Sequence, residues 1–178
     1  MYLLCADLEG VFVPEVWINV SEKTGIPELR RTTRDEPDYN KLMHYRMKIL
    51  DEHGLKLHHI QEVIAQIRPL PGALEFLAWV KERMQLIVVS DTFIQFADPL
   101  MKQLARPTLF CHSLVMDETD RIIDYKLRQP DPKRKTVEAL QSLKYQVIAI
   151  GDSYNDCSML KQADTGILFR PPENVVKD

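Results

Sequence analysis

VIAIGDSYND, residues 147–156, passes from a short apolar run directly into acidic and small polar residues. The same change occurs earlier in the chain, where the run at residues 2–8 turns acidic and the run at residues 86–89 meets a serine. A weaker fourth run lies at residues 165–169. Short, continuous apolar runs bounded by turn residues are typical of fully buried parallel strands.

Segments with helical periodicity separate these runs, at residues 72–84, 93–104 and 132–143. Asp131 is the expected N-cap of the last helix, and Pro132 suits its first position. Alternating strands and helices predict a Rossmann-like α/β fold, with a parallel sheet and helices on both faces. In such sheets the ligand lies beyond the carboxyl ends of the strands, where all three polar clusters fall. Residues 109–127 instead predict an antiparallel hairpin, as a flap off the sheet.

Residues 14–71 break this alternation, because they carry helical patterns but no convincing strand. Helices are predicted at residues 39–50 and 56–67, with Gly54 between them as a C-cap signal. We interpret the region as a small helical cap inserted after the first strand. The predicted division is a catalytic core of residues 1–13 and 72–178 and a cap of residues 14–71.

Composition narrows the class of protein. The 178 residues are 45% hydrophobic and 28% charged, which are globular proportions, and the net charge is -3. This balance offers no broad basic surface for nucleic acid or an acidic membrane. The first apolar run meets Asp7 at once, unlike a secretory signal, and no run approaches the ~20 residues of a membrane span. We therefore expect a cytoplasmic protein that acts on a small molecule, with no nucleic-acid or membrane partner.

The cysteines agree with a reducing compartment. They number three, at positions 5, 111 and 157, with no CxxC pair, which argues against a disulfide framework and a zinc site. Buried free thiols are the simplest interpretation. Cys157 follows an acidic cluster, so a reactive thiol is the alternative there.

The residues at the predicted strand ends are of the types that together describe a phosphoryl site. Their acidic members suit Mg²⁺, which takes carboxylates and keeps waters at its other positions. Ser90 offers a hydroxyl, Asp91 and Thr92 are expected to open a helix whose free N–H groups favour an anion, and Lys133 adds a positive charge. The chain lacks the Gly-rich Lys-Ser/Thr loop of nucleotide triphosphatases, which argues against an ATP-dependent kinase. In chain order the strand-end residues are Asp7, Glu9, Ser90, Lys133, Asp152 and Asp156.

Each of these residues has a purely structural interpretation. Asp7 and Glu9 could form a solvated strand end, the two later aspartates could cap the following helix, and Lys133 could lie on a solvated helix face. The case for a site rests on their joint order at successive strand ends.

Four segments resemble the signature motifs of the haloacid dehalogenase superfamily, in order and over nearly the whole chain. They are DLEGV (7–11), SDT (90–92), Lys133 and GDSYND (151–156). The helical insert resembles the C1-type cap of phosphoserine phosphatases. Glu9 stands where most phosphatases of the family have aspartate. This form resembles a subgroup described as phosphoserine phosphatase and phosphoserine:homoserine phosphotransferase.

The resemblance implies a Mg²⁺-dependent phosphomonoesterase acting on L-phosphoserine. Asp7 would form an aspartyl phosphate, and Glu9 would protonate the leaving alkoxide and then activate the acceptor. The implied roles are catalytic for Asp7, Glu9 and Lys133; metal-binding for Asp7, Glu9 (through its backbone carbonyl), Asp152 and Asp156; and substrate-binding for Glu15, Arg46, Ser90, Asp91, Lys133 and Asn155.

The predicted cap supplies the residues that would recognise phosphoserine. Arg46 would grip the substrate carboxylate bidentately, and Glu15 would pair with the ammonium. The alternative interpretations are an exposed helix arginine and a first-turn glutamate favoured by the helix dipole. None of the five histidines is assigned a role, and the neighbours His58 and His59 cannot share a helix face as a metal clip.

Three functions remain in competition. The first is phosphoserine hydrolysis, with transfer of the phosphoryl group to homoserine as a second reaction. The second is a related phosphatase for another small phosphomonoester. The third is a receiver-like signalling domain that holds an aspartyl phosphate without turnover. A receiver, however, has its lysine after the last strand and no helical cap, whereas Lys133 precedes the Asp152/Asp156 pair.

Overall fold

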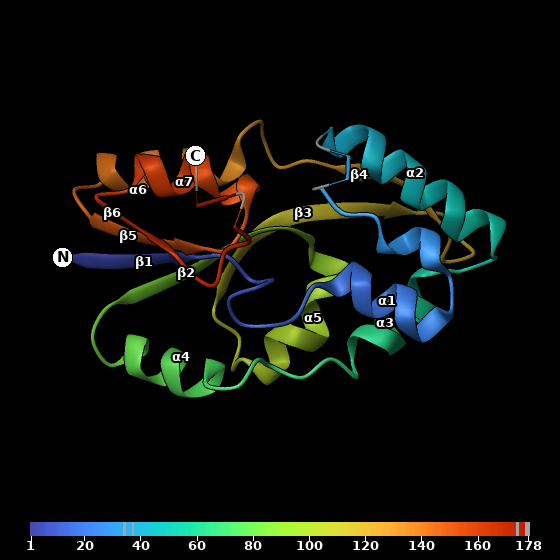
Figure 1. The fold of residues 1–178 in the computed structure, drawn as a ribbon, viewed down its shortest axis with the longest axis horizontal. Helices are drawn as coiled ribbons and strands as arrows, with labels where there is room; N and C mark the ends of the chain where they lie inside the picture. Colours follow the sequence, from blue (N-terminus) through green and yellow to red (C-terminus); the bar gives the residue numbers. More distant parts are fainter. Residues whose placement is uncertain (34, 37, 174, 177–178) are drawn as a thin grey trace.

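The predicted parallel sheet is the centre of the molecule in a computed structural model that describes residues 1–33, 35–36, 38–173 and 175–176 (Figure 1). Within these residues, six strands form one sheet in the order β4-β3-β2-β1-β5-β6. All neighbouring strands are parallel except β3 and β4. The strands are β1 (Tyr2–Ala6), β2 (Gln85–Phe93), β3 (Thr108–Met116), β4 (Ile122–Lys126), β5 (Gln146–Gly151) and β6 (Thr165–Leu168).

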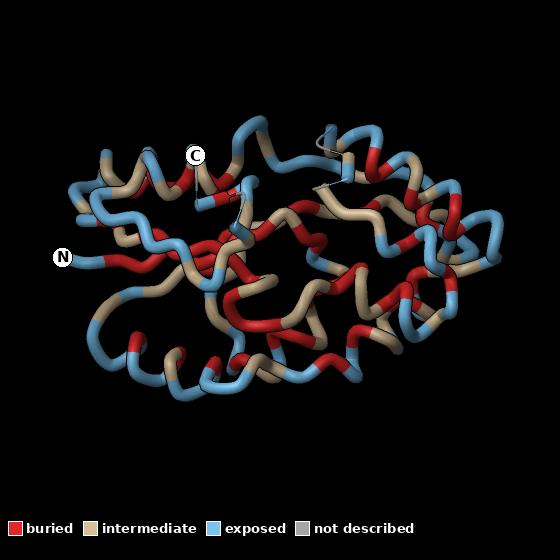
Figure 2. Tube along the Cα trace, viewed as in Figure 1, coloured by how far each residue is buried: buried red, intermediate tan, exposed pale blue. Residues whose placement is uncertain are grey.

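Helices cover both faces of this sheet, which confirms the α/β prediction (Figure 1). Successive side chains of β1 point to opposite faces, so Leu4 and Ala6 enter one core cluster while Leu3 and Cys5 enter another. Figure 2 shows the buried residues concentrated along these central strands. The first cluster packs under α4 (Ala73–Lys81) and α5 (Ile94–Gln103), and the second under α6 (Pro132–Ser142) and α7 (Cys157–Gln162).

The described residues of the insert form three α-helices and one 3-10 helix. They are α1 (Val16–Thr24), η1 (Pro27–Arg30), α2 (Tyr39–Glu52) and α3 (Leu57–Ile64). Helices α2 and α3 agree with the prediction, and Gly54 ends α2 as expected, with a left-handed φ of 63°. The separate helix α1 was not predicted. Its Trp17 packs edge-on against Phe96 of α5, with ring centroids 5.7 Å apart, so the insert and the body share one core.

Strand β2 is longer than predicted, and this corrects the expected helix start. Asp91 and Thr92 lie within β2, and α5 begins only at Ile94. The pairing of β2 with β3 is irregular after Val89 but resumes where Phe93 meets His112, so the chain stays extended across the serine motif. The prediction that Asp91 and Thr92 open a helix is therefore wrong. Instead, the Thr92 backbone N–H donates to the Ser90 hydroxyl over 3.2 Å.

Two further expectations are corrected in part. Asp131 occupies the N-cap position of α6, but its φ is 48° and its carboxylate accepts from Ser158 and Arg134 instead of capping the helix. The antiparallel hairpin is confirmed, but it continues the sheet, because the first half of β3 pairs with β2 and the second half with β4. No helix of the described residues is long and apolar enough to cross a membrane.

Candidate active site

A cavity of about 80 Å³ lies between the strand ends and the helical insert. Every predicted site residue lines it except Asp156, which is fully buried behind it. From the body of the fold, the lining includes Asp7, Glu9, Ser90, Asp91, Lys133, Asp152 and Asn155. From the insert, it includes Glu15, Trp17, Tyr39 and Arg46.

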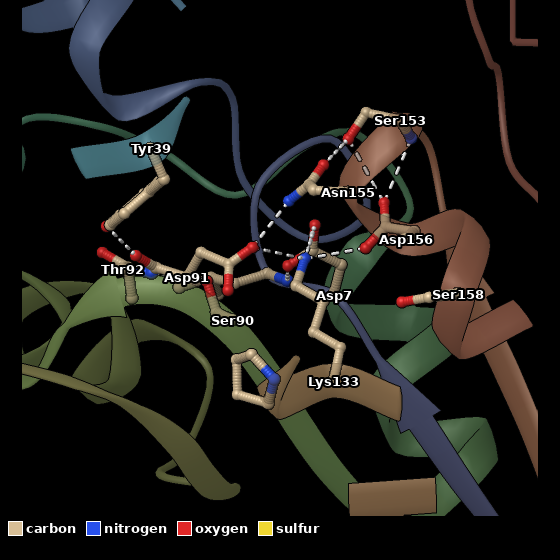
Figure 3. A network of polar contacts seen from close by, with 12 residues as sticks. Asp7, Tyr39, Ser90, Asp91, Thr92, Lys133, Ser153, Asn155, Asp156 and Ser158 are labelled. Carbon is tan, nitrogen blue, oxygen red and sulfur yellow. Dashed lines mark hydrogen bonds and ion pairs between the residues drawn. The ribbon is translucent and has the colours of Figure 1, made fainter. Parts of the chain in front are cut away.

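Lys133 is the positive centre of the site (Figure 3). It lies in the first turn of α6 and is only 2% exposed, so the interpretation as a solvated helix residue is wrong. Its Nζ lies 2.7 Å from Asp156 Oδ1, 2.9 Å from Asp7 Oδ2 and 3.6 Å from an Asp91 oxygen. Burial disfavours the ammonium, but these three carboxylates outweigh it and raise the pKa of Lys133 well above its usual value. Lys133 is therefore a fixed cation.

Asp7 follows β1 directly and is buried in an acidic cluster. Burial and the charge of Asp156 raise the pKa of Asp7 well above its usual value, although Lys133 opposes this. One ligand oxygen each from Asp7, Asp152 and Asp156 lies within 4.8 Å of the others. One lysine does not balance these three buried carboxylates, so the donor set fits a hard divalent cation.

The loop after β5 holds Asp156 in place. Its Oδ2 accepts the backbone N–H groups of Asp152 and Ser153, at 3.0 and 3.1 Å, while its Oδ1 bonds Lys133. A Cβ on Gly151 would lie 2.3 Å from the Asp156 Cγ, so glycine is required there. Asp156 stands at the N-cap position of α7 but makes no side-chain capping bond to that helix, so the interpretation as a cap of the following helix is wrong. Its carboxylate instead orders the preceding loop and anchors Lys133.

Arg46 of α2 is 6% exposed, so the interpretation as an exposed helix arginine is wrong. Its guanidinium lies 4.4 Å from the Trp17 ring centroid, and one terminal nitrogen donates to the Arg31 carbonyl over 2.8 Å. Burial lowers the pKa of Arg46 to about 10. Among the buried side-chain nitrogens and oxygens of the described residues, Arg46 Nε alone has no hydrogen-bond partner. An unpaired buried donor at a cavity wall is a candidate position for a ligand oxygen.

Glu9 and Glu15 meet at the start of α1. Glu15 stands at the N-cap position, outside the first turn, and makes no capping bond with its side chain. Glu9 caps the helix instead, because its Oε2 accepts a hydrogen bond from the Val16 backbone N–H over 2.7 Å. Burial, assisted by the charge of Glu15 and opposed by Val16 and Arg46, raises the pKa of Glu9 to about 8. Glu9 is therefore protonated at neutral pH and able to donate a proton.

Sequence reasoning missed two residues of this network. The Tyr39 hydroxyl donates to the Asp91 carbonyl over 2.8 Å, and His112 Nε2 lies 3.5 Å from the Asp91 carboxylate. Tyr39 begins a predicted helix and His112 lies in the predicted hairpin, far from the motifs along the chain. The sequence carries no local signal that would have connected either residue to Asp91.

Comparisons with known proteins find relatives of this chain. A family model described as haloacid dehalogenase-like hydrolase matches residues 13–164. A protein of Pseudomonas aeruginosa named phosphoserine phosphatase ThrH is 59% identical over 178 residues, covering 100% of this chain and 87% of the relative. A phosphoserine phosphatase of Pseudomonas syringae is also 59% identical, over 99% of this chain and 74% of the relative.

Solved structures show the same fold at low sequence identity. A phosphoserine phosphatase described as a phospho-aspartyl intermediate analogue superposes with a TM-score of 0.82 at 19% identity, covering 99% of this chain and 90% of the other. A substrate-bound phosphoserine phosphatase complex gives a TM-score of 0.82 at 20% identity, covering 99% and 89%.

Proposed function

Because the chain belongs to the haloacid dehalogenase-like hydrolase family, we propose that it hydrolyses L-phosphoserine in a Mg²⁺-dependent reaction through an aspartyl phosphate on Asp7. The observation that carries the proposal is the pairing of two sites in one cavity. Asp7 and Lys133, which would form the phosphoryl site, line the same cavity as Arg46, whose Nε has no hydrogen-bond partner among the described residues. The phosphate of phosphoserine would bind beside Asp7 and Lys133, and its carboxylate would bind Arg46.

Asp7 and Glu9 would perform the covalent step. The Asp7 carboxylate attacks phosphorus, and the bond from phosphorus to the serine oxygen breaks. Glu9, protonated at neutral pH, gives its proton to that leaving oxygen. It then takes a proton from the water that attacks the phosphoaspartate, the bond from phosphorus to the Asp7 oxygen breaks, and inorganic phosphate leaves. Lys133 and the Ser90 hydroxyl line the cavity and would hold the transferring oxygens.

Mg²⁺ would be held by Asp7, the Glu9 backbone carbonyl and Asp152, with Asp156 beside them. Support for this comes from the clustered buried oxygens of the three aspartates. When bound, the ion would neutralise negative charge that the phosphate brings to an already acidic site.

Residues 14–71 would act as the cap that recognises the serine portion. In this role Arg46 binds the substrate carboxylate and Glu15 the ammonium. The cavity of about 80 Å³ is smaller than the roughly 300 Å³ at which ligand pockets usually begin.

Transfer to homoserine is the finer part of the proposal. Homoserine is serine with one added methylene, so the same Arg46 and Glu15 contacts would hold it after serine leaves. Its hydroxyl competes with water for the phosphoaspartate and wins only if binding orients it well.

The test uses phosphoserine with an isotopic label on its phosphate, with Mg²⁺, with and without homoserine. Labelled inorganic phosphate is expected without the acceptor, and labelled phosphohomoserine with it. If all label remains inorganic at saturating homoserine, transfer is refuted and hydrolysis stands. If phosphoserine is inert while an aryl phosphate is hydrolysed, the substrate is another phosphomonoester. If Asp7 is labelled without phosphate release, the receiver-like alternative is correct.

A further inference from the structure

His112 is a buried polar residue of the site region that the proposed reaction does not use. It lies on β3 and is 5% exposed, with its ring between Phe93 and Tyr39 at centroid distances of 6.2 and 6.1 Å. A buried imidazole on a central strand must have its two nitrogens satisfied. The partners of those nitrogens show what it can do.

The two ring nitrogens of His112 have different partners. The Arg128 backbone N–H donates to Nδ1 over 3.1 Å, so Nδ1 carries the lone pair. The proton of the neutral ring is thereby assigned to Nε2, which lies 3.5 Å from Asp91 Oδ1. Such contacts are often long in ligand-free enzymes and shorten in the reacting complex. His112 therefore places its Nε2–H beside one oxygen of Asp91, at the long end of the hydrogen-bond range.

Asp91 connects His112 to the residues of the proposed phosphoryl site. Its other oxygen, Oδ2, accepts from Asn155 Nδ2 over 2.8 Å and lies 3.6 Å from Lys133 Nζ (Figure 3). Burial alone would raise the pKa of Asp91, but Lys133 and the His112 and Asn155 contacts hold it well below the usual range. Asp91 is thus a half-buried anion beside Ser90, where a phosphoryl group would sit.

An anion at this position needs its direction controlled. If the Asp91 carboxylate turned toward the phosphoryl group, its charge would repel the substrate. If His112 holds it in place, the carboxylate faces Lys133 and orders the side-chain amide of Asn155. The Asp91–Asn155 hydrogen bond also connects the end of β2 with the loop after β5, the two segments that flank the nucleophile.

We propose that His112 is a positioning residue for phosphoryl transfer, holding Asp91 so that Asp91 in turn places Asn155 and Lys133. This inference rests on the proposed phosphatase function. Because His112 acts at the phosphoryl end, it affects phosphoserine and an aryl phosphate alike, whereas Arg46 concerns phosphoserine alone.

Two conservative variants separate positioning from packing. In His112→Gln, the side-chain amide N–H₂ takes the place of Nε2 and reaches Asp91, but Arg128 loses its acceptor. In His112→Asn, the amide oxygen takes the place of Nδ1 and serves Arg128, but nothing reaches Asp91. We expect His112→Asn to lower kcat roughly tenfold or more on both phosphoserine and p-nitrophenyl phosphate, with little change in KM. We expect His112→Gln to keep most of kcat and to show the lower Tm.

The opposite pattern, with kcat lost in His112→Gln and kept in His112→Asn, would overturn the proposal. A double-mutant comparison guards against variants that fold poorly. In an Asp91→Ala background, His112→Asn should cost less than twofold further, and a full additional loss there also overturns it. Wild-type protein that hydrolyses only p-nitrophenyl phosphate would refute the phosphoserine assignment while leaving this test intact.

Discussion

Burial determines the charge state of individual side chains in the cavity. Loss of solvent raises the pKa of Glu9 to about 8 and lowers that of Arg46 to about 10, so Glu9 is neutral and Arg46 charged at neutral pH. Lys133 is almost fully buried but keeps its charge, because three carboxylates face it. One neutral carboxyl group and two cations therefore occur in the same cavity because their neighbours differ.

Arg46→Ala tests the carboxylate contact. A charge-assisted bidentate contact is worth about 2 kcal/mol, so KM for phosphoserine should rise roughly 30-fold. KM for an aryl phosphate without a carboxylate should change less than about twofold. Arg83→Ala is the matched control, because Arg83 also stacks on a tryptophan, at 4.7 Å, but on the exposed surface of the body. Equal losses on both substrates would mean that Arg46 supports the cap and does not recognise substrate.

Glu9→Gln tests the raised pKa through stability. The folded protein keeps the Glu9 proton up to about pH 8, while the unfolded chain loses it near the ordinary value of 4.5. Between these pH values Glu9 is protonated in the folded state and ionised in the unfolded state. The free energy of unfolding of the wild-type protein therefore falls by about 1.4 kcal/mol for each unit that the pH rises. In urea titrations of metal-free protein, the variant should gain stability relative to wild type as pH rises from 5 to 8. A stability difference between Glu9→Gln and wild type that stays constant from pH 5 to 8 would contradict the assignment.

At the scale of elements, the sequence predicted what depends on local patterns. The apolar runs gave β1, β2, β5 and β6, and Gly54 correctly separated α2 from α3. Two features depended on tertiary contacts instead. Helix α1 is capped from outside by Glu9, seven residues before the Val16 N–H it accepts, and β2 continues past its apolar run because Phe93 pairs with His112. Neither partner can be recognised from the segment itself.

Gly10→Ala tests the loop that follows β1. Gly10 has a φ of 78°, and a Cβ there would lie 2.3 Å from Asp152 Cγ. Gly25, with a φ of 70° at the end of α1, has no atom within 4 Å of that position. Gly25→Ala should therefore cost roughly 1–2 kcal/mol of stability with kcat intact. Gly10→Ala must also displace Asp152, so its kcat should fall at least about 100-fold. Similar kcat values for the two variants would show that the approach of Gly10 to Asp152 is unimportant.

At the scale of the whole molecule, the site exists because two regions of the chain are held together. The β3–β4 hairpin contacts the insert at both ends of α2. Arg121 lies 2.7 Å from Asp51, and the Tyr125 hydroxyl donates to Asn40 over 2.6 Å. This also explains the limit of sequence reasoning. The motif residues could be grouped because parallel strands end at one edge, whereas His112 comes to Asp91 only through the fold.

Metal binding should be visible in the stability of the whole protein. An ion that binds only the folded state stabilises it by about 2.7 kcal/mol at 100 times its Kd. Mg²⁺ should therefore raise the Tm of wild-type protein, and chelation should abolish turnover. Asp7→Asn should respond differently, because it removes a carboxyl group whose pKa is raised by burial and by the charge of Asp156.

Metal-free Asp7→Asn should accordingly be at least as stable as metal-free wild type, with no turnover and little response to Mg²⁺. Asp98→Asn is the control, because Asp98 is an exposed carboxylate that pairs with Lys102 and Arg106 on the surface of α5. It should keep the full Mg²⁺ response. Thermal unfolding at matched ionic strength measures all three proteins. If Mg²⁺ raises the Tm of Asp7→Asn as much as that of wild type, the ion binds elsewhere and the acidic cluster is not its site.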